Sequence, residues 1–415
     1  MKISEIKPEV WKLAHEAEAE LKDIYNRIDH IAEINTIKVM EAFQDNKVSD
    51  SCFAGTSGYG YDDVGREVLD NVYAQVFKTE SALVRIGFVN GTHALSVALF
   101  SMLKPGDTLL SVTGLPYDTL RNAIGIEGNY HGSLKFYGIN YAQVDMKEGN
   151  PDIESIKAAA ADKSVSAVLI QRSRGYDDRR ALSAEEIGEI CAAVKSVNPE
   201  IYVMVDNCYG EFTGEHEPTE YGVDLIAGSL IKNPGGGLAP TGGYIAGKAN
   251  LVENAAMRLT TPGIGGECGA TLGNNRLLFQ GFFIAPHVTA QALKTAVFCS
   301  AMMNKIGFET SPAVDEPRND IIQMVTLKSA DNMKKFCKGI QSGAPVDSYV
   351  TPEPWQMPGY NCPVIMAAGA FIQGSSIELS ADGPMKEPYI AYMQGGITYE
   401  AGKMGIIMAV NEMLS

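Results

Sequence analysis

The sequence predicts an α/β fold: a mainly parallel sheet of seven strands covered by helices, with a helical N-terminal arm and a smaller α+β C-terminal domain. Three patterns in the 415 residues predict it. Short apolar runs alternate with helical stretches through the middle of the chain, as in parallel strands joined by helices. Residues 8–44 lack glycine and carry apolar residues at helical spacing. After about residue 300, proline and glycine become more frequent between short strand and helix candidates.

These patterns divide the chain into an arm over residues 1–60, a large domain over 61–300 and a small domain over 301–415. The stretch Phe53–Asp63, rich in glycine and tyrosine, predicts an ordered loop. The strands predicted for the large domain are 82–89, 108–112, 134–137, 167–170, 201–205, 225–227 and 243–245, and its helices include 92–103, 153–161 and 184–194. The small domain is predicted to hold strands at 321–327 and 364–371 and a helix at 331–342.

Composition limits the classes of partner. The 50 acidic and 34 basic residues give a net charge of −16, and no long basic block occurs, which argues against nucleic acid and anionic membranes. Seven cysteines without a CxxC pair favour reduced thiols over a disulfide framework. The N-terminus is charged, and no run approaches 18 uncharged apolar residues. We therefore expect a soluble cytoplasmic protein that binds a small molecule and has no metal site.

The most informative segment, VDLIAGSLIKNPGGGLAPTGG over residues 223–243, places Lys232 between an apolar strand and a glycine-rich turn. Burial lowers the pKa of a lysine and makes its amine a nucleophile that forms a Schiff base with a carbonyl. A lysine at a strand end can instead extend to solvent. Ser229 and Lys232 also spell the S-x-x-K motif of serine β-lactamases, but its S-D-N and K-T-G partners are missing, so acyl transfer is set aside.

A second apolar strand, IYVMVDNCYGEF over residues 201–212, ends in Asp206. Ligands of α/β sheets bind beyond the carboxyl ends of the strands, so this carboxylate is expected to face the ligand. It could pair with a protonated pyridine nitrogen and keep a cofactor ring electron-withdrawing. It could equally cap the next turn or bind Mg²⁺.

Two weaker signals precede these strands. A strand runs through Gly91-Thr92 directly into a helix, whose free N–H groups and dipole suit a phosphate. The loop GLPYDT after the next strand carries Tyr117, which could stack on a flat ring. Both features are common in proteins that bind no cofactor, and the chain lacks the G-x-G-x-x-G pattern of a nicotinamide-binding enzyme in the required context.

The order Gly91-Thr92, Tyr117, Asp206, Lys232 resembles that of fold-type I pyridoxal-phosphate enzymes. Longer sequence segments carry a closer resemblance to one family: VNGTHA, GLPYDTL, VDNCYGEF, GSLIKNPGGGLAPTGGYIAG, FQGFFIAPHV, FIQGSSIELSADGP and YMQGG. Over nearly the whole chain, they are similar to the cystathionine β-lyase or methionine γ-lyase-like family, whose members are also labelled aluminium-resistance proteins.

The resemblance implies pyridoxal 5′-phosphate as the cofactor and assigns the following residues to it. Lys232 would form the Schiff base, Asp206 would pair with the pyridinium nitrogen and Tyr117 would stack on the ring. Gly91, Thr92 and Ser229 would hold the phosphate, His93 would pack beside the cofactor, and Gln171 would contact the phenolic oxygen.

In the related sulfur-amino-acid lyases, a tyrosine of a neighbouring subunit reaches the phosphate, and Tyr61 in the Tyr59-Gly-Tyr61 loop is similar in position. The resemblance therefore implies a homo-oligomer with shared active sites, a dimer at least and by analogy a tetramer. These lyases also bind the substrate carboxylate with an arginine of the C-terminal domain. Arg318 is the candidate here, because its planar guanidinium suits a carboxylate, and Lys386 is a second one.

The expected activity is β- or γ-elimination from a sulfur amino acid of the cystathionine, cysteine or methionine type. Lys232 would remove the Cα proton, and Tyr117 would assist proton movement toward the leaving sulfur. The same lysine and aspartate would serve an aldolase or an aminotransferase equally well. The uncertain carboxylate arginine also leaves open a cofactor-binding protein whose substrate pocket has degenerated.

Overall fold

The computed structural model describes residues 2–128, 130–176, 179–357 and 362–415. The chain forms two compact units, one made of residues 1–35 and 284–415 and the other of residues 36–283. Helices α2 (Lys22–Asp45) and α9 (Asn275–Lys305) each run from one unit into the other. None of the described helices is both long and apolar enough to cross a membrane.

The larger unit is built on a mainly parallel sheet, which confirms the predicted fold class. Among the described residues the sheet has seven strands in the order β1-β7-β6-β5-β4-β2-β3. The strands from β6 to β3 are mutually parallel, whereas β7 is antiparallel to both of its neighbours. The strands are β1 (Ser81–Arg85), β2 (Thr108–Ser111), β3 (Asn140–Gln143), β4 (Val165–Gln171), β5 (Tyr202–Asp206), β6 (Leu225–Ser229) and β7 (Gly243–Gly247).

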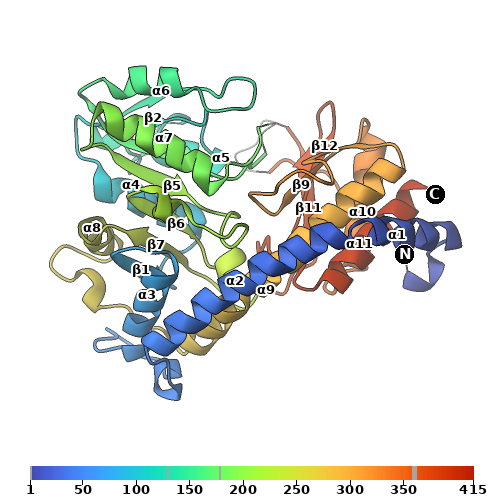
Figure 1. Cartoon of the computed structure of the whole chain (residues 1–415), viewed down its shortest axis with the longest axis horizontal. Helices are drawn as coiled ribbons and strands as arrows, with labels where there is room; N and C mark the ends of the chain where they lie inside the picture. The colour runs from blue at the N-terminus through green and yellow to red at the C-terminus, as the bar shows by residue number, and fades with distance from the viewer. Residues whose placement is uncertain (1, 129, 177–178, 358–361) are drawn as a thin grey trace. The chain divides into compact units, whose positions relative to one another are not determined.

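Helices connect and cover these strands: α3 (Val64–Val76), α4 (Gly91–Met102), α5 (Asp118–Ile124), α6 (Ile153–Ala160), α7 (Ala184–Val197) and α8 (Ala249–Leu259). Side chains at their N-caps fix where several begin; Asn90 caps α4, and Ser183 forms a capping box at α7. Figure 1 shows α6 and α7 side by side, and α4 packs against α8, β6 and β7.

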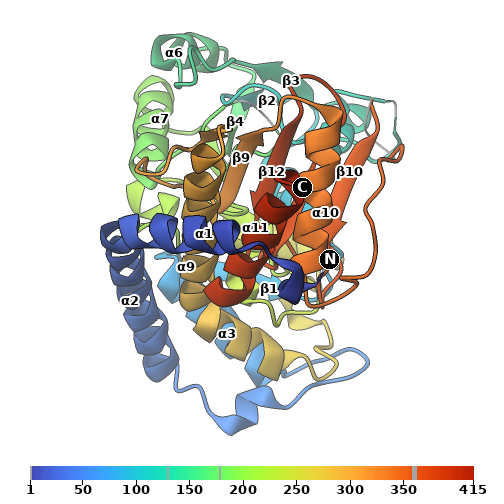
Figure 2. The ribbon, with the colours of Figure 1, turned by 90° about the vertical axis from the view of Figure 1, so that its right-hand side faces the viewer.

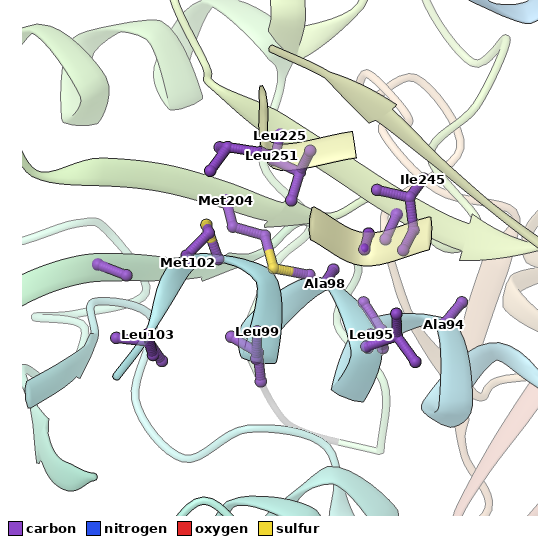
Figure 3. Packing of buried hydrophobic residues seen from close by; sticks show 14 of the residues in the cluster. Ala94, Leu95, Ala98, Leu99, Met102, Leu103, Met204, Leu225, Ile245 and Leu251 are labelled. Atoms are coloured by element: carbon purple, nitrogen blue, oxygen red, sulfur yellow. The ribbon is translucent and has the colours of Figure 1, made fainter. Parts of the chain in front are cut away.

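The core that fixes α4 is shown in Figure 3. Apolar side chains at helical spacing, Leu95, Leu99 and Met102, lie on the same helix. They belong to one buried cluster with Met204 of β5 and Leu225 of β6. Because α4 is held on the sheet in this way, its N-terminus has a fixed place relative to the carboxyl ends of β5 and β6.

The smaller unit has an antiparallel sheet in the order β10-β11-β12-β9-β8 over the described residues. Helices α10 and α11 pack against each other, as Figure 2 shows, and α1 contacts α11. The unit therefore has the α+β character of the predicted fold class, and it also includes α1 from the predicted N-terminal arm. Its elements are α1 (Pro8–Glu20), β8 (Glu309–Ser311), β9 (Ile322–Thr326), α10 (Ala330–Gly343), β10 (Val364–Ala368), β11 (Ser380–Pro384), β12 (Ile390–Gln394) and α11 (Tyr399–Met413).

One predicted strand is wrong. Residues 134–137 do not join the sheet; Lys135–Tyr137 is a 3₁₀ turn that ends at Gly138, whose φ is +79°. Its aromatic side chains are exposed, by 51% for Phe136 and 46% for Tyr137, so they do not form the buried face that the apolar run suggested. The strand beside β2 is the next segment, Asn140–Gln143, which lacks an apolar run because it is a partly exposed edge strand.

Candidate active site

The N-terminus of α4 lies against the end of β6. The Asn90 side chain caps the helix by accepting a 2.8 Å hydrogen bond from the His93 N–H. A Cβ placed on Gly91 would be only 3.1 Å from the Ser229 Cβ and 3.7 Å from the Cys208 Sγ. The absence of a side chain at Gly91 therefore lets the helix approach the ends of β5 and β6 closely.

The Ser229 hydroxyl is the unusual group at this junction. Its Oγ is buried and has no hydrogen-bond partner among the described residues, and it lies 3.8 Å from the Cβ position of Gly91. A buried hydroxyl without a partner is costly, so a ligand acceptor is a natural complement to it. The Thr92 hydroxyl, by contrast, shares a 2.6 Å hydrogen bond with the Thr119 hydroxyl of α5.

Asp206 ends β5 and is almost completely buried, with 5% exposure. It stands in register with Gln171 of β4 on one side and Ala227 of β6 on the other. Its Oδ1 accepts a 3.2 Å hydrogen bond from the Cys208 N–H. Burial raises the pKa of Asp206, although the positive charge of Lys232 and the Cys208 hydrogen bonds oppose the rise.

Lys232 follows β6, and its side chain reaches back to the turn after β5. Its Nζ lies 3.9 Å from the centroid of the Tyr209 ring. Burial disfavours the ammonium and lowers the pKa of Lys232. Four acidic groups nearby oppose this effect and raise the pKa overall; they belong to Cys208, Tyr209, Asp206 and Glu211. Burial by itself lowers this pKa, as expected, but the expected net lowering is wrong because the neighbouring acidic groups outweigh burial.

Tyr117 is brought to the same edge of the sheet by Gln171. The Gln171 Oε1 accepts a 2.8 Å hydrogen bond from the Tyr117 N–H, and its Nε2 donates to the Ser173 carbonyl at 3.2 Å. Because Gln171 is in register with Asp206, the tyrosine loop is tied to the strand that neighbours β5. The Tyr117 ring lies 6.2 Å from the Tyr176 ring at a tilt of 46°.

His93 lies on the first turn of α4 and is half-buried. Its Nδ1 accepts a 3.2 Å hydrogen bond from the Val89 N–H, and its ring meets Phe88 edge-on at 5.8 Å. Burial lowers the pKa of His93. Because Nδ1 accepts this hydrogen bond, the neutral form of the imidazole carries its proton on Nε2.

Comparison with known proteins gives the family. A family model described as methionine gamma-lyase matches residues 10–414. The chain belongs to the methionine gamma-lyase family. The resemblance seen in the sequence is thereby confirmed.

The relatives are similar over nearly their whole length. YnbB, an uncharacterized protein of Bacillus subtilis strain 168, is 49% identical over 405 residues, which are 97% of this chain and 96% of that protein. The crystal structure of a carbon-sulfur lyase involved in aluminum resistance from Clostridium novyi NT is 54% identical, with a TM-score of 0.94 over 98% of this chain and 96% of that one.

A more distant likeness concerns the fold alone. The Escherichia coli protein YhfS, described as pyridoxal-5′-phosphate dependent, has 17% identity and a TM-score of 0.63 over 93% of this chain and 96% of its own. Together with the family, this likeness confirms the predicted fold-type I architecture.

The two tyrosines of the Tyr59–Tyr61 loop are exposed. The two rings stack at 5.6 Å, and 55% of Tyr61 is exposed. A hydrogen bond with Cys268 raises the pKa of Tyr61. The buried Arg66 guanidinium fastens the loop by donating from one nitrogen to the carbonyls of Gly60, at 2.6 Å, and of Gly269, at 2.8 Å.

The two residues suggested for the substrate carboxylate belong to the other compact unit. The Arg318 Nη2 donates to the Ala313 carbonyl at 3.4 Å, and Lys386 is exposed. Six of the predicted site residues lie within the larger unit: Gly91, Ser229, Asp206, Lys232, Gln171 and Tyr117. Arg318 and Lys386 belong to the smaller unit.

Sequence patterns missed three residues around Lys232. Tyr209 lies under the ammonium with a positive φ of +71°, and Glu211 is fully buried. Asn233, the neighbour of Lys232, joins both to the lysine turn. One feature of the sequence could have indicated Glu211: it is an acidic residue directly before Phe212, shortly after an apolar strand.

Proposed function

We propose that this chain is a pyridoxal-phosphate-dependent carbon–sulfur lyase that acts on a sulfur amino acid, with Lys232 carrying the cofactor. The family and the lyase from Clostridium novyi support this class of reaction. The observation that carries the proposal is the placement of Asp206 and Lys232 at the carboxyl ends of neighbouring parallel strands. Asp206 ends β5, and Lys232 follows β6, which pairs with β5 in parallel.

The residues present suit this cofactor. The N-terminus of α4 at Gly91 and the unpartnered hydroxyl of Ser229 suit a phosphate. Asp206 is a buried carboxylate of the kind that would hold a ring nitrogen. Tyr117 would stack on the ring, and Gln171 would use its remaining amide hydrogen toward the cofactor's phenolic oxygen. Thr92 and His93 would complete the wall on the α4 side.

When bound, pyridoxal phosphate withdraws electrons from the Cα of an amino acid attached to it. The protein's task is then to move protons. Lys232 would accept the Cα proton at its Nζ once that nitrogen is released and neutral. The Tyr117 hydroxyl would deliver a proton to the leaving sulfur. These two proton transfers would suffice for β-elimination, whereas γ-elimination would also require removal of a proton from Cβ.

The remaining parts of the proposal concern assembly and substrate binding. Tyr61 would reach the phosphate of a neighbouring subunit, which requires a homo-oligomer, either a dimer or a tetramer. Its exposure and the buried support from Arg66 favour such a contact. Arg318 would bind the substrate carboxylate, with Lys386 as a second candidate. A cytoplasmic location fits these assignments.

Product analysis tests the proposed function. Purified protein reconstituted with pyridoxal phosphate should convert sulfur amino acids to a thiol plus pyruvate, for β-elimination, or plus 2-oxobutyrate, for γ-elimination. Lys232→Ala should lose the visible absorption of the lysine-bound cofactor and the turnover. Glycine as the product would instead indicate an aldolase, and a new amino acid in stoichiometric amount an aminotransferase. Absence of any lysine-bound cofactor would refute the proposal.

A further inference from the structure

Glu211 is a buried acid that the proposed reaction leaves without a role. None of its side chain is exposed. Its Oε1 accepts a 2.9 Å hydrogen bond from the Tyr244 hydroxyl, and its Oε2 is buried without a hydrogen-bond partner among the described residues. A charged carboxylate in such surroundings costs free energy, so the presence of a glutamate at this position needs an explanation.

The fold makes room for this carboxyl at the end of β6. A Cβ on Gly228, the residue before Ser229, would lie 2.6 Å from the Glu211 Oε1 and 2.6 Å from the Tyr244 Cε1. Position 228 therefore requires glycine, because the side chains of Glu211 and Tyr244 occupy the space that a Cβ would need. Gly228 belongs to β6, and β6 leads into the turn that carries Lys232. The Glu211 side chain therefore packs against the strand that precedes this turn.

Asn233 links the acid to the lysine through the backbone. Its side-chain amide donates 3.0 Å hydrogen bonds to the carbonyls of both Tyr209 and Glu211. The turn that carries Lys232 is thus fastened to the turn that carries Tyr209 and Glu211. The Tyr209 ring in turn lies under the Lys232 ammonium.

The charged and titratable groups around this pair come from several elements. Glu211 faces Tyr244 of β7, Tyr73 of α3 and the loop residues Cys208, Glu217 and Lys232. Lys232 faces Cys208, Tyr209, Asp206 and Glu211. Glu217 is already paired with the buried Arg172 at 2.9 Å, and Asp206 feels the charge of Arg179. Unlike Glu217, Glu211 makes no ion pair with any of the described residues.

We propose that Glu211 is a positioning residue for Lys232: held by Tyr244 and Asn233, it sets the pH at which the lysine nitrogen loses its proton. The inference rests on the proposed function, because it acts through the lysine that carries the cofactor. Burial raises the pKa of Glu211 to about 8, so this acid gains its negative charge as the pH rises through that value. Each group favours the charged form of the other.

Two variants test the proposal. Glu211→Gln keeps the shape and the acceptor for Tyr244 but removes the charge. Tyr244→Phe removes the hydrogen bond that favours the charged form of Glu211. Both should therefore lower the pKa of the Lys232 nitrogen, Glu211→Gln by about one unit and Tyr244→Phe by less. The matched control is Glu185→Gln, because exposed Glu185 accepts a 2.8 Å hydrogen bond from Tyr221 on the surface of the same unit.

The readout is the pH titration of the visible absorption of the lysine-bound cofactor, recorded on reconstituted protein. A second readout needs no cofactor: the pH dependence of reductive methylation of Lys232, followed by mass spectrometry of its peptide. A lowered pKa in Glu211→Gln, with Glu185→Gln unchanged, supports the proposal. Superimposed profiles of wild type and both variants overturn it, even where the melting temperature falls, since a purely structural role predicts that result.

The two readouts also separate this inference from the proposed function. If wild-type protein never forms a lysine-bound cofactor, the proposed function fails, whereas the methylation profile still decides whether Glu211 controls Lys232. If Glu211→Gln does not fold, Tyr244→Phe decides by the direction of its shift. A rise in the pKa of Lys232 in that variant contradicts the proposal.

Discussion

Gly91 and Ser229 approach so closely that a Cβ on Gly91 would lie 3.1 Å from the Ser229 Cβ. Two segments separated by more than a hundred residues thus meet at one point, where the N-terminus of α4 faces the end of β6. This contact places the first turn of α4 next to the Ser229 hydroxyl, which has no hydrogen-bond partner among the described residues. It therefore gives a direct way to test the phosphate position.

Gly91→Ala should weaken cofactor binding. Gly91 does not have a positive φ, so alanine suits its backbone and only the contact with Ser229 opposes it. We expect overpacking to cost about 1–3 kcal/mol of stability and cofactor affinity to fall about tenfold or more. Fluorescence titration with pyridoxal phosphate and thermal unfolding measure the two effects. Gly87→Ala, with no atom within 4 Å of its added Cβ, is the control and should leave both unchanged.

Ser229→Ala should have opposite effects on the free and the cofactor-bound protein. Removing a buried hydroxyl without a partner should leave the free protein equally stable or more stable, by up to about 1 kcal/mol. Cofactor affinity should nevertheless fall, because the phosphate loses a donor. Ser101→Ala offers the contrast, since its buried hydroxyl donates to the Ala98 carbonyl at 2.7 Å and its loss should destabilise the protein. Unchanged affinity in Ser229→Ala would remove this residue from the phosphate site.

The residues that could be predicted from sequence are those whose place follows from strand order. Asp206 and Lys232 follow two neighbouring parallel strands, so their meeting at one sheet edge was foreseeable. The surroundings that raise the pKa of Lys232 were not, because Tyr209 and Glu211 depend on the path of a loop. The failure of residues 134–137 to form a strand could not be foreseen either, because an apolar run does not reveal which side chains will be exposed.

Glu211 should make the stability of the free protein depend on pH. Its pKa is about 8 in the folded chain and near the ordinary 4.5 when unfolded. Between these values the folded state binds the extra proton, so stability falls as pH rises, by at most ~1.4 kcal/mol per pH unit from this group. Thermal or urea unfolding of wild type and Glu211→Gln from pH 4.5 to 9 should show curves that diverge in favour of the variant. Parallel curves would mean that Glu211 keeps an ordinary pKa.

Tyr117→Phe should separate stacking from proton transfer. The ring and the backbone N–H that donates to the Gln171 side chain at 2.8 Å both remain, so cofactor affinity should change little. Turnover should fall by about 10²–10⁴, as for the loss of a general acid, with the cofactor's absorption spectrum preserved. Tyr117→Ala should lose affinity as well, because the aromatic ring proposed to stack on the cofactor is then missing. If Tyr117→Phe keeps full turnover, the proton for the leaving sulfur comes from another group, and Tyr117 only stacks on the cofactor.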